Sequence, residues 1–538
     1  MSDSNAIIGI NFGTSYTSIA YLNKEGRADC LANEEGDRQI PSALAFHGEE
    51  EVVGSQAKSD IARHTDTTVA NFRAELGKSF SQSENLPGSA APIIEKDGQP
   101  AYQITLPDST VTFTASEVST KFLRHIRESA EAFLGTAVSG AVLAVPSHFD
   151  DNQRKALTQA AEAAGINVLQ LIHESAAAVL AYEAANKSEK KDKTVVVCDL
   201  GGHSLDVTAL TVRSGLYSVL ATAHDVKLGG SSFDDLLINH FSAEFKKKTK
   251  VDITSNRKAL AKLRGAVEVT KKMLSSANTA PCFVESLCDG LDFHGTINRM
   301  RFEIMANKVF SKVLDVVRQV LDKAQLDASE VDEVLLVGGS ARIPKLAIKM
   351  REIFTSDDTI VRATELEADE VVARGCALQG NLLAGYDKET IDASQEAVIT
   401  VAPHTSKAIG TVSANGDFVT IIPSGTSLPA RRTFEVGVAD AQHAYLAIHE
   451  AERVIEKVEI PVEPVEVEEG EEPIEEEPEI VTKVVYKPAT LLAEACLSLS
   501  KGKDTKVEVQ ITLDKDSKMD LVMREKNGSN IVKVAGKQ

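Results

Sequence analysis

The chain has 538 residues, more than one hydrophobic core usually serves, so we expect two to four domains. Its composition, 43% hydrophobic and 25% charged, is typical of globular proteins, and no apolar run is long enough to cross a membrane. The formal net charge of −21 argues against direct binding to nucleic acid, because phosphate contacts require clustered lysine and arginine.

The N-terminal sequence and the cysteine spacing predict the cellular compartment of the protein. The first residues, MSDSNAIIG, lack the basic and apolar regions of a signal peptide, so we expect none. The cysteines are scattered and show neither CxxC nor zinc-ligand spacing; they are Cys30, Cys198, Cys282, Cys288, Cys376 and Cys496. We interpret them as buried free thiols in a reducing compartment, which predicts a cytoplasmic protein.

One sequence pattern occurs twice, first at residues 7–22, IIGINFGTSYTSIAYL, and again at 194–212, TVVVCDLGGHSLDVTALTV. Each copy has an apolar strand, a glycine turn with a hydroxyl residue and a second apolar strand. Such a turn can point successive backbone N–H groups at an anion, and its small residues allow a phosphate to approach closely. A third glycine turn lies in VDEVLLVGGSARIPK, residues 331–345. Two related hairpins facing each other predict a clamp that holds a nucleotide's phosphates from both sides.

Between the two hairpins, strand and helix patterns alternate. Residues 114–135 predict a helix that begins at a Thr114–Glu117 capping box and ends at Gly135. The apolar stripe expected on this helix consists of Val118, Phe122, Ile126 and Phe133. Further strands are expected at 140–146 and 167–172, and further helices at 150–165 and 176–186. This alternation predicts α/β layers up to about residue 387.

Residues 257–276 predict a helix with one polar face. Glu268, Lys271, Lys272 and Ser275 recur at the spacing of that face. Taken alone, the stripe is typical of paired Glu and Lys side chains in solvent. Next to a phosphate clamp, the same stripe suits the ribose and adenine of a nucleotide.

After residue 387 the pattern becomes antiparallel β. Residues 410–423 predict a hairpin with an Asn415–Gly416 turn, and 507–523 place apolar residues at every second position. Residues 459–479 contain eleven Glu and no Lys or Arg, which predicts a disordered acidic insert at about 457–482. This insert is either a solvated tether or a docking segment for a basic partner. We predict an α/β nucleotide-binding domain over 1–387, a linker over 388–402 and a small β domain over 403–538.

Eight stretches together resemble the signatures of the heat shock protein 70 family. They are GINFGTSYTS, VPSHFDDNQR, LIHESAAAVLAY, CDLGGHSLDV, LGGSSFDD, AVEVTKKMLSS, VGGSARIPK and ADEVVARGCALQG. The resemblance covers nearly all of 1–387 and continues more faintly through 400–538. It implies an α/β, actin-like ATPase domain, built as a duplicated ribonuclease H-like fold. A small, truncated all-β domain of the peptide-binding type follows, without the family's helical lid.

The resemblance also implies a site for ATP. The positions that match the family's nucleotide-binding motifs are Gly13, Thr14, Ser15, Tyr16, Asp199, Gly201, Gly202, His203, Ser204, Gly229, Gly230, Glu268, Lys271, Lys272, Ser275, Gly338, Gly339, Ser340, Arg342 and Asp369. A magnesium ion, if one is bound, is expected near Asp199. No other metal ligand is predicted.

Four positions bear on whether ATP is hydrolysed. Asn11 replaces an Asp that helps to hold hydrated magnesium in the family, and Arg73 replaces the Lys implicated in positioning the attacking water. His203 replaces a glycine of the second phosphate loop, and Glu174 is followed by Ser-Ala in place of Pro-Thr. Losing several positioning groups lowers rate far more than affinity. We therefore expect ATP binding with little or no hydrolysis and no working catalytic residue. A role for His203 as a base is the alternative.

These departures resemble the atypical, ribosome-associated branch of the family. That resemblance implies a stable heterodimer with the J-domain protein zuotin, attachment to the ribosome through this partner, and stimulation of a second, hydrolysing heat shock protein 70 as nascent chains fold. An acidic chain is repelled by ribosomal RNA and needs such a partner as its anchor. The alternatives are an ordinary ATP-hydrolysing, peptide-binding chaperone, a nucleotide-exchange factor like the 110-kDa relatives, and a sugar kinase of the same fold.

Overall fold

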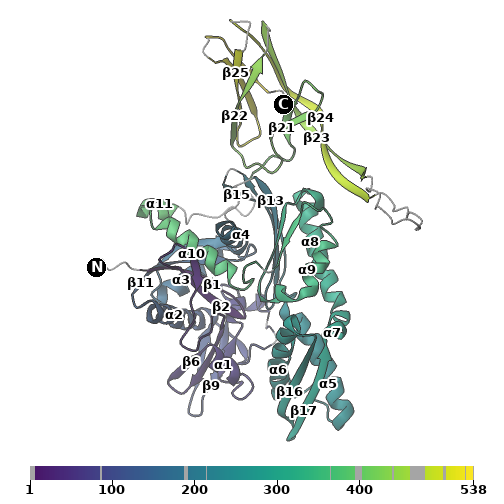
Figure 1. Ribbon diagram of the computed structural model, residues 1–538. Helices are drawn as coiled ribbons and strands as arrows, with labels where there is room; N and C mark the ends of the chain where they lie inside the picture. Colours follow the sequence, from purple (N-terminus) through teal and green to yellow (C-terminus); the bar gives the residue numbers. More distant parts are fainter. Residues whose placement is uncertain are drawn as a thin grey trace, which may run out of the picture.

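A computed structural model describes residues 6–84, 86, 88–186, 192–213, 215–363, 365–393, 403–438, 442–460, 479–500, 505–526 and 529–536. The N-terminal part contains two large sheets with the same strand order, which lie side by side in Figure 1. The first has the order β12-β11-β1-β2-β3, from β1 (Ala6–Phe12), β2 (Tyr16–Leu22), β3 (Ala28–Cys30), β11 (Val138–Val145) and β12 (Val168–His173). The second has the order β19-β18-β13-β14-β15, from β13 (Lys193–Leu200), β14 (Leu205–Arg213), β15 (Leu216–Asp225), β18 (Glu333–Val337) and β19 (Ile360–Arg362).

The strand directions in the two sheets also correspond. β1 pairs antiparallel with β2 and parallel with β11, as β13 pairs antiparallel with β14 and parallel with β18. The repeated hairpins therefore occupy equivalent places in two copies of one topology. The two related halves expected from the repeat, and the duplicated, actin-like α/β fold that the family resemblance implies, are confirmed.

Helices fill the space between the sheets and cover their outer faces. α4 (Glu174–Ala185) and α10 (Val371–Leu383) pack between the sheets, in a core that also includes residues of β11, β13 and β18. α2 (Ala115–Leu134) and α3 (Asp151–Ala163) share a core with the first sheet, and α5 (Gly230–Thr249), α6 (Arg257–Ser276) and α8 (Asn307–Ala324) share one with the second.

Smaller elements complete this domain. The helices are α1 (Ser55–Asp60), α7 (Arg299–Met305), α9 (Pro344–Arg351) and the 3-10 helices η1 (Phe72–Glu75), η2 (Phe80–Gln82), η3 (Ala328–Glu330) and η4 (Gly339–Arg342). The strands are β4 (Ile40–Pro41), β5 (Ala43–His47), β6 (Glu50–Val53), β7 (Thr68–Ala70), β8 (Ile93–Lys96), β9 (Gln99–Thr105), β10 (Thr110–Thr114), β16 (Thr279–Cys288) and β17 (Leu291–Asn298).

Helix α2 begins and ends where the sequence predicts. Thr114 and Glu117 form a reciprocal capping box, and Gly135 ends the helix with a left-handed φ of 67°. Three members of the predicted stripe are buried, but Phe133 is 51% exposed, so its assignment to the core is wrong. Phe133 lies in the last turn of the helix, where its ring meets that of Tyr21 of β2 at 5.9 Å.

The C-terminal β domain has two four-stranded antiparallel sheets. One has the order β21-β20-β23-β24, from β20 (Ile409–Val412), β21 (Phe418–Ile422), β23 (His443–Ile460) and β24 (Glu479–Ser498). The other has the order β22-β25-β26-β27, from β22 (Ala430–Val438), β25 (Thr505–Leu513), β26 (Met519–Glu525) and β27 (Ile531–Ala535). The predicted hairpin at 410–423 is confirmed. The region 507–523 forms two strands rather than one, because the chain reverses where Asp514 donates to the carbonyl of Lys518.

Both ends of the segment predicted as a disordered acidic insert are β-strand in the structure. Residues 461–478 lie outside the described residues, but both flanks belong to the β23–β24 hairpin, where Lys457 pairs with Thr482 and Ile460 with Glu479. Apolar residues alternate along these flanks, and this alternation favours pairing despite the charge. The predicted linker likewise begins with helix α11 (Lys388–Ala393), and its residues 394–402 lie outside the described part.

The β domain contacts the second half of the nucleotide-binding domain. Thr211 of β14 donates a hydrogen bond of 2.8 Å to the carbonyl of Gly425. Glu330 of η3 accepts a hydrogen bond of 3.1 Å from Tyr486 and also pairs with Arg453 of the long β23–β24 hairpin. Figure 1 shows the β domain above the end of the molecule where β13 and β15 lie.

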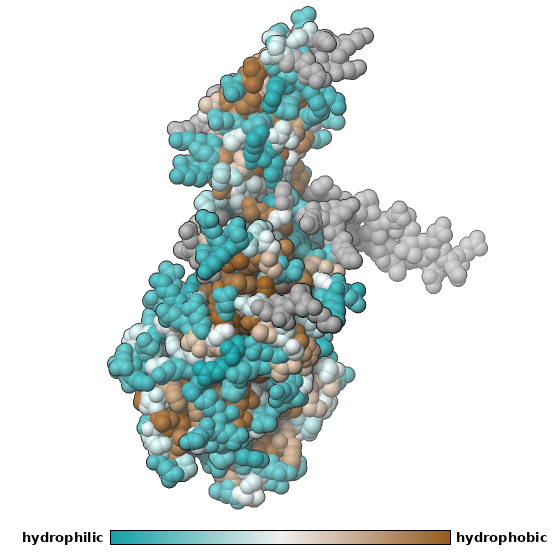
Figure 2. All heavy atoms as spheres, turned by 90° about the vertical axis from the view of Figure 1, so that its left-hand side faces the viewer, coloured by the Kyte–Doolittle hydropathy of each residue, from teal (hydrophilic) through white to brown (hydrophobic). Residues whose placement is uncertain are grey.

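The surface and the cysteines agree with most of the expectations. On the face seen in Figure 2, hydrophobic side chains form separate patches among hydrophilic ones. No helix in the described part of the chain combines the length and apolarity needed to span a membrane. Five cysteines are buried free thiols, but Cys496 is exposed, so the prediction is wrong for that residue. Cys496 lies on β24, where side chains alternate between the core and the solvent.

Candidate functional site

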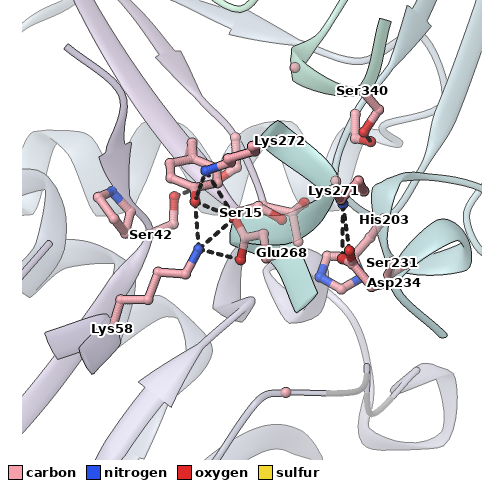
Figure 3. Close-up of a pocket in the computed structure, with 18 of the residues that line it drawn as sticks. Ser15, Ser42, Lys58, His203, Ser231, Asp234, Glu268, Lys271, Lys272 and Ser340 are labelled. Atoms are coloured by element: carbon pink, nitrogen blue, oxygen red, sulfur yellow. Dashed lines mark hydrogen bonds and ion pairs between the residues drawn. The ribbon is translucent and has the colours of Figure 1, made fainter. Parts of the chain in front are cut away.

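The two repeated hairpins face each other across a cavity between the halves of the domain. Their turns come so close that a Cβ atom on Gly202 would lie 2.1 Å from the Oγ of Ser15. The third glycine turn, which contains η4, lines the same cavity of about 2110 Å³ (Figure 3). The sequence prediction that the two turns oppose each other is therefore confirmed.

Most of the positions matched to nucleotide-binding motifs line this cavity. They are Gly13, Thr14, Ser15, Tyr16, Asp199, Gly201, Gly202, His203, Ser204, Glu268, Lys271, Lys272, Ser275, Gly338, Gly339, Ser340, Arg342 and Asp369. Gly229 and Gly230 are not among the lining residues; they start α5 behind the second turn, where Gly230 N–H donates to the carbonyl of Gly201 at 3.0 Å. The departing positions Asn11, Arg73 and Glu174 also line the cavity. Their roles in binding stay predictions.

An ion-pair network connects the two halves at one side of the cavity. Lys58 of α1 contacts both carboxylate oxygens of Glu268 at 2.9 and 2.7 Å, and Lys272 approaches the same carboxylate at 3.1 Å. The hydroxyl of Tyr16 donates to Glu268, and both lysines lie over the Tyr16 ring (Figure 3). Burial opposes ionisation of Glu268, but the two ammonium groups outweigh it and lower its pKa. The network holds the halves together across the entrance to the cavity.

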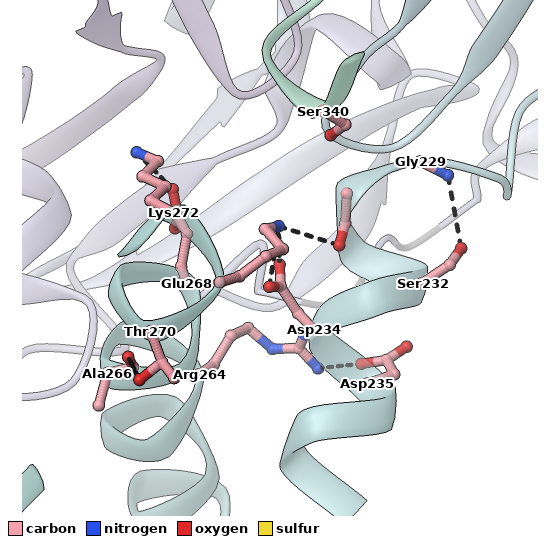
Figure 4. A network of polar contacts seen from close by, with 12 residues as sticks. Gly229, Ser232, Asp234, Asp235, Arg264, Ala266, Glu268, Thr270, Lys272 and Ser340 are labelled. Atoms are coloured by element: carbon pink, nitrogen blue, oxygen red, sulfur yellow. Dashed lines mark hydrogen bonds and ion pairs between the residues drawn. The ribbon is translucent and has the colours of Figure 1, made fainter. Parts of the chain in front are cut away.

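The other lysine of the α6 stripe is buried. Lys271 pairs with Asp234 of α5 at 2.8 Å and donates to the carbonyl of Gly230 at 3.0 Å (Figure 4). The two side chains are 11% and 10% exposed. Burial raises the pKa of Asp234, and the nearby Lys271 opposes this rise. The predicted stripe therefore divides into a bridge between the halves and an ion pair that joins α5 to α6.

The third glycine turn packs against the second. A Cβ atom on Gly338 would lie 2.4 Å from the carbonyl oxygen of Leu200, and the φ of 85° at this position also favours glycine. The Ser340 hydroxyl donates to the carbonyl of Gly201 at 2.8 Å. The guanidinium of Arg342 pairs with Glu367 and, at 2.5 Å, with Asp369. Two predicted binding residues, Arg342 and Asp369, are thus partners of each other.

The replaced lysine position forms a buried ion pair. The Nη2 of Arg73 donates to Glu174 at 2.6 Å, and the two side chains are 9% and 11% exposed. Burial raises the pKa of Glu174, and Arg73 opposes this rise. Burial, together with Glu174 and Asp206, also raises the pKa of Asp199. The guanidinium of Arg73 and the carboxylate of Glu174 thus engage each other among the residues that line the cavity.

The side chain of His203, from the second half of the domain, contacts the first half. Its Nε2–H donates to the side-chain oxygen of Asn71 at 3.1 Å, and its Nδ1 has no hydrogen-bond partner within the described residues. The φ of His203 is not positive, so the backbone at this position does not require a glycine. Burial, with Arg264 and Lys271 nearby, lowers the pKa of His203 to about 4. A general base works best when its pKa is near the working pH, so this environment argues against catalysis by His203.

Several lining residues were missed by the sequence reasoning. They are Lys58, Asn71, Asp234 and Arg264. Asp234 lies within the quoted stretch LGGSSFDD and Asn71 two residues before Arg73, so motif context was a signal for both. Lys58 follows no motif used above. Its role depends on how α1 and α6 meet in space.

One buried histidine beside this site predicts a pH dependence of stability. His173 is 7% exposed, and burial with the nearby Arg154 lowers its pKa from 6.5 to about 4. The unfolded chain therefore binds more protons than the folded one between these values, so stability rises with pH across this window. The His173→Asn variant should show a shallower rise, by at most about 1.4 kcal/mol per pH unit.

This dependence can be measured by urea unfolding at several pH values from 4.5 to 7, followed by far-ultraviolet circular dichroism. His64→Asn is the control, because His64 is exposed, and it should retain the wild-type slope. An identical slope in His173→Asn and wild type would contradict the prediction.

The family model described as Hsp70 protein matches residues 7–461. A heat shock protein 70 homologue of Schizosaccharomyces pombe is 39% identical over 98% of this chain and 95% of its own length. The ribosome-associated complex subunit SSZ1 of Saccharomyces cerevisiae is 35% identical over 98% of this chain and 99% of its own. Heat shock 70 kDa protein 14 of Danio rerio is 35% identical over 94% and 99%.

Proposed function

The chain belongs to the heat shock protein 70 family, and we propose that it is an atypical member that binds ATP with little or no hydrolysis. It acts as a co-chaperone in a stable heterodimer with a J-domain protein of the zuotin type. Through this partner it sits at the cytoplasmic ribosome. There it stimulates a second, hydrolysing heat shock protein 70 in the folding of nascent chains.

The observation that carries the proposal is the ion pair between Arg73 and Glu174 in a cavity that also has Asn11. Phosphoryl transfer depends on positioned charges and a positioned nucleophile. Here a carboxylate is bound by a guanidinium at 2.6 Å, and a neutral amide stands where the family has an aspartate. Binding of ATP demands less precise positioning than its hydrolysis. The glycine turns and the polar stripe of α6, which are the residues predicted to bind ATP, line the cavity. This combination supports ATP as a structural ligand that stays bound and is not hydrolysed.

Two observations support the partner. A relative 35% identical over 98% of this chain carries the name ribosome-associated complex subunit. The net charge of −21 disfavours direct contact with ribosomal RNA, so the anchor is a partner with a basic surface. The J-domain of such a partner would act on the second heat shock protein 70, and the present chain would support it.

A reconstitution tests this function. The ATP turnover of a hydrolysing cytoplasmic heat shock protein 70 is measured with its J-domain partner, in the presence and absence of the full-length protein. We expect the protein to co-purify with the J-domain partner in equal amounts and to increase the stimulation. Failure to bind the J-domain partner would contradict the proposal. Accelerated ADP release from the second chaperone by this protein alone would favour a nucleotide-exchange factor instead.

A further inference from the structure

The charges around the phosphate-binding turns bear on the form in which ATP is held. Magnesium in nucleotide sites keeps several waters and is bound by one or two carboxylates together with phosphate oxygens. Three carboxylates line this part of the cavity: Glu174, Asp199 and Asp206. Within the described residues, no three side chains of His, Cys, Asp or Glu are arranged to hold a metal ion. The question is which of the three carboxylates are available.

Two of these carboxylates already have partners. Glu174 accepts from Arg73 at 2.6 Å, and Asp206 accepts from Nδ1–H of His148 at 2.9 Å. Asn11, at the end of β1, completes this side of the cavity with a neutral amide. Only Asp199 lacks such a cationic or imidazole contact among the interactions described above. One carboxylate of the three, Asp199, therefore remains for a magnesium ion, which is the smallest number that such sites use.

The same residues offer an alternative source of positive charge. A guanidinium stays protonated and presents several donors in a fixed plane, which suits phosphate oxygens. Arg73 is 9% exposed, lies 5.1 Å over the Phe149 ring, and its Nε has no hydrogen-bond partner in the described part of the chain. It is therefore held in place with donor capacity to spare. The side-chain amide of Asn11 can donate directly to a phosphate oxygen, whereas an aspartate would need a cation between them.

We propose that this site binds the triphosphate of ATP as the free anion, with Arg73 and Asn11 in place of a required magnesium ion. The inference rests on the proposed function, because it specifies the form in which unhydrolysed ATP is held. It also explains why two positions change together. An aspartate at 11 would repel a metal-free triphosphate, and a neutral residue at 73 would leave the phosphate charge and Glu174 without a counter-ion.

The test measures ATP binding to the full-length protein, freed of nucleotide, by titration calorimetry in excess magnesium chloride and in excess EDTA. We expect the dissociation constants of the wild type to agree within about tenfold, a difference below about 1.4 kcal/mol. In EDTA, Arg73→Met should weaken ATP binding by about tenfold or more, while Arg124→Met, at an exposed position of α2, should match the wild type. Asn11→Asp should make binding depend more strongly on magnesium.

A loss of more than about tenfold for the wild type in EDTA would overturn the inference. So would unchanged binding by a folded Arg73→Met variant in EDTA. The same samples are analysed for ADP. Rapid ADP formation contradicts the proposed function, whereas magnesium-dependent binding without ADP formation contradicts only this inference. Absence of ATP binding under both conditions would contradict both.

Discussion

The Gly375→Ala variant should lower the free energy of unfolding of the nucleotide-binding domain by about 3 kcal/mol or more. Gly375 lies inside α10, and a Cβ atom there would be 1.9 Å from the carbonyl oxygen of Ala177 in α4. The backbone of α10 fixes the position of this Cβ atom and the oxygen belongs to the backbone of α4, so no side-chain rotation can relieve the contact. On the other side of α10, a Cβ on Gly9 of β1 would lie 2.2 Å from the amide nitrogen of Ala377. The helix is thus fixed between a strand and a second helix.

The matched control is Gly265→Ala in α6. Gly265 is also inside a helix, but nothing lies within 4 Å of an added Cβ atom. Its substitution should stabilise the domain by about 0.5–1 kcal/mol, because alanine is the better helix former. Urea unfolding followed by circular dichroism measures both, since the chain has no Trp for fluorescence. Equal effects of the two substitutions would show that α4 and α10 are not packed as described.

The Lys271→Met variant should cost about 3–5 kcal/mol of stability, because it leaves the buried Asp234 without its cation. The pair is held at 2.8 Å with both side chains about a tenth exposed, at 11% and 10%. In Lys272→Met the loss should stay below about 1 kcal/mol. The Lys272 side chain is 58% exposed, and Lys58 still pairs with Glu268. Urea unfolding followed by circular dichroism measures the stability of both variants.

A double variant separates the ion pair from simple loss of packing. Lys271→Met with Asp234→Leu removes both charges, and replacing a whole buried pair by apolar residues is often neutral. We therefore expect the double variant to be more stable than Lys271→Met alone. Nucleotide binding should stay weak in both, because both lack the lysine that lines the cavity. A double variant no more stable than the single one would contradict the account of this pair.

The sequence pattern was sufficient to predict the architecture of the site. The repeated hairpins indicate two equivalent half-domains, and the short distance between Ser15 and Gly202 follows from that duplication. The capping box of α2 and the polar stripe of α6 depend on neighbours three to seven residues away along the chain, so local patterns capture them. The positions of the glycine turns were therefore predictable, and most of the predicted binding residues line the cavity.

The pairings across the cavity were not predictable. Arg73 and Glu174 are separated by 101 residues, His203 and Asn71 by 132, and Lys58 and Glu268 by 210. Such contacts depend on how elements far apart in the sequence meet in space, and a local pattern carries no information on that. The exposed Phe133 and the paired flanks of the acidic insert show a related limit of prediction from sequence. The pattern along a segment does not reveal which other elements of the fold lie next to it.

These cross-cavity pairs determine the chemical character of the site. The network of Lys58, Tyr16, Glu268 and Lys272 joins the halves, and the glycine turns leave room for phosphate. Arg73 and Glu174, which line the same cavity, are held in an ion pair with each other. Restoring one position is therefore insufficient, and we expect Asn11→Asp alone to remain inactive because Arg73 and His203 are unchanged.

Single-turnover hydrolysis of labelled ATP is the most direct test of this account. The full-length protein and its Asn11→Asp variant are each loaded with ATP in the presence of magnesium, and ADP is followed over time beside a hydrolysing heat shock protein 70. We expect both to retain ATP and to form ADP at least about 100-fold more slowly than the reference. Hydrolysis by the wild type at a rate near that of the reference would contradict the central claim.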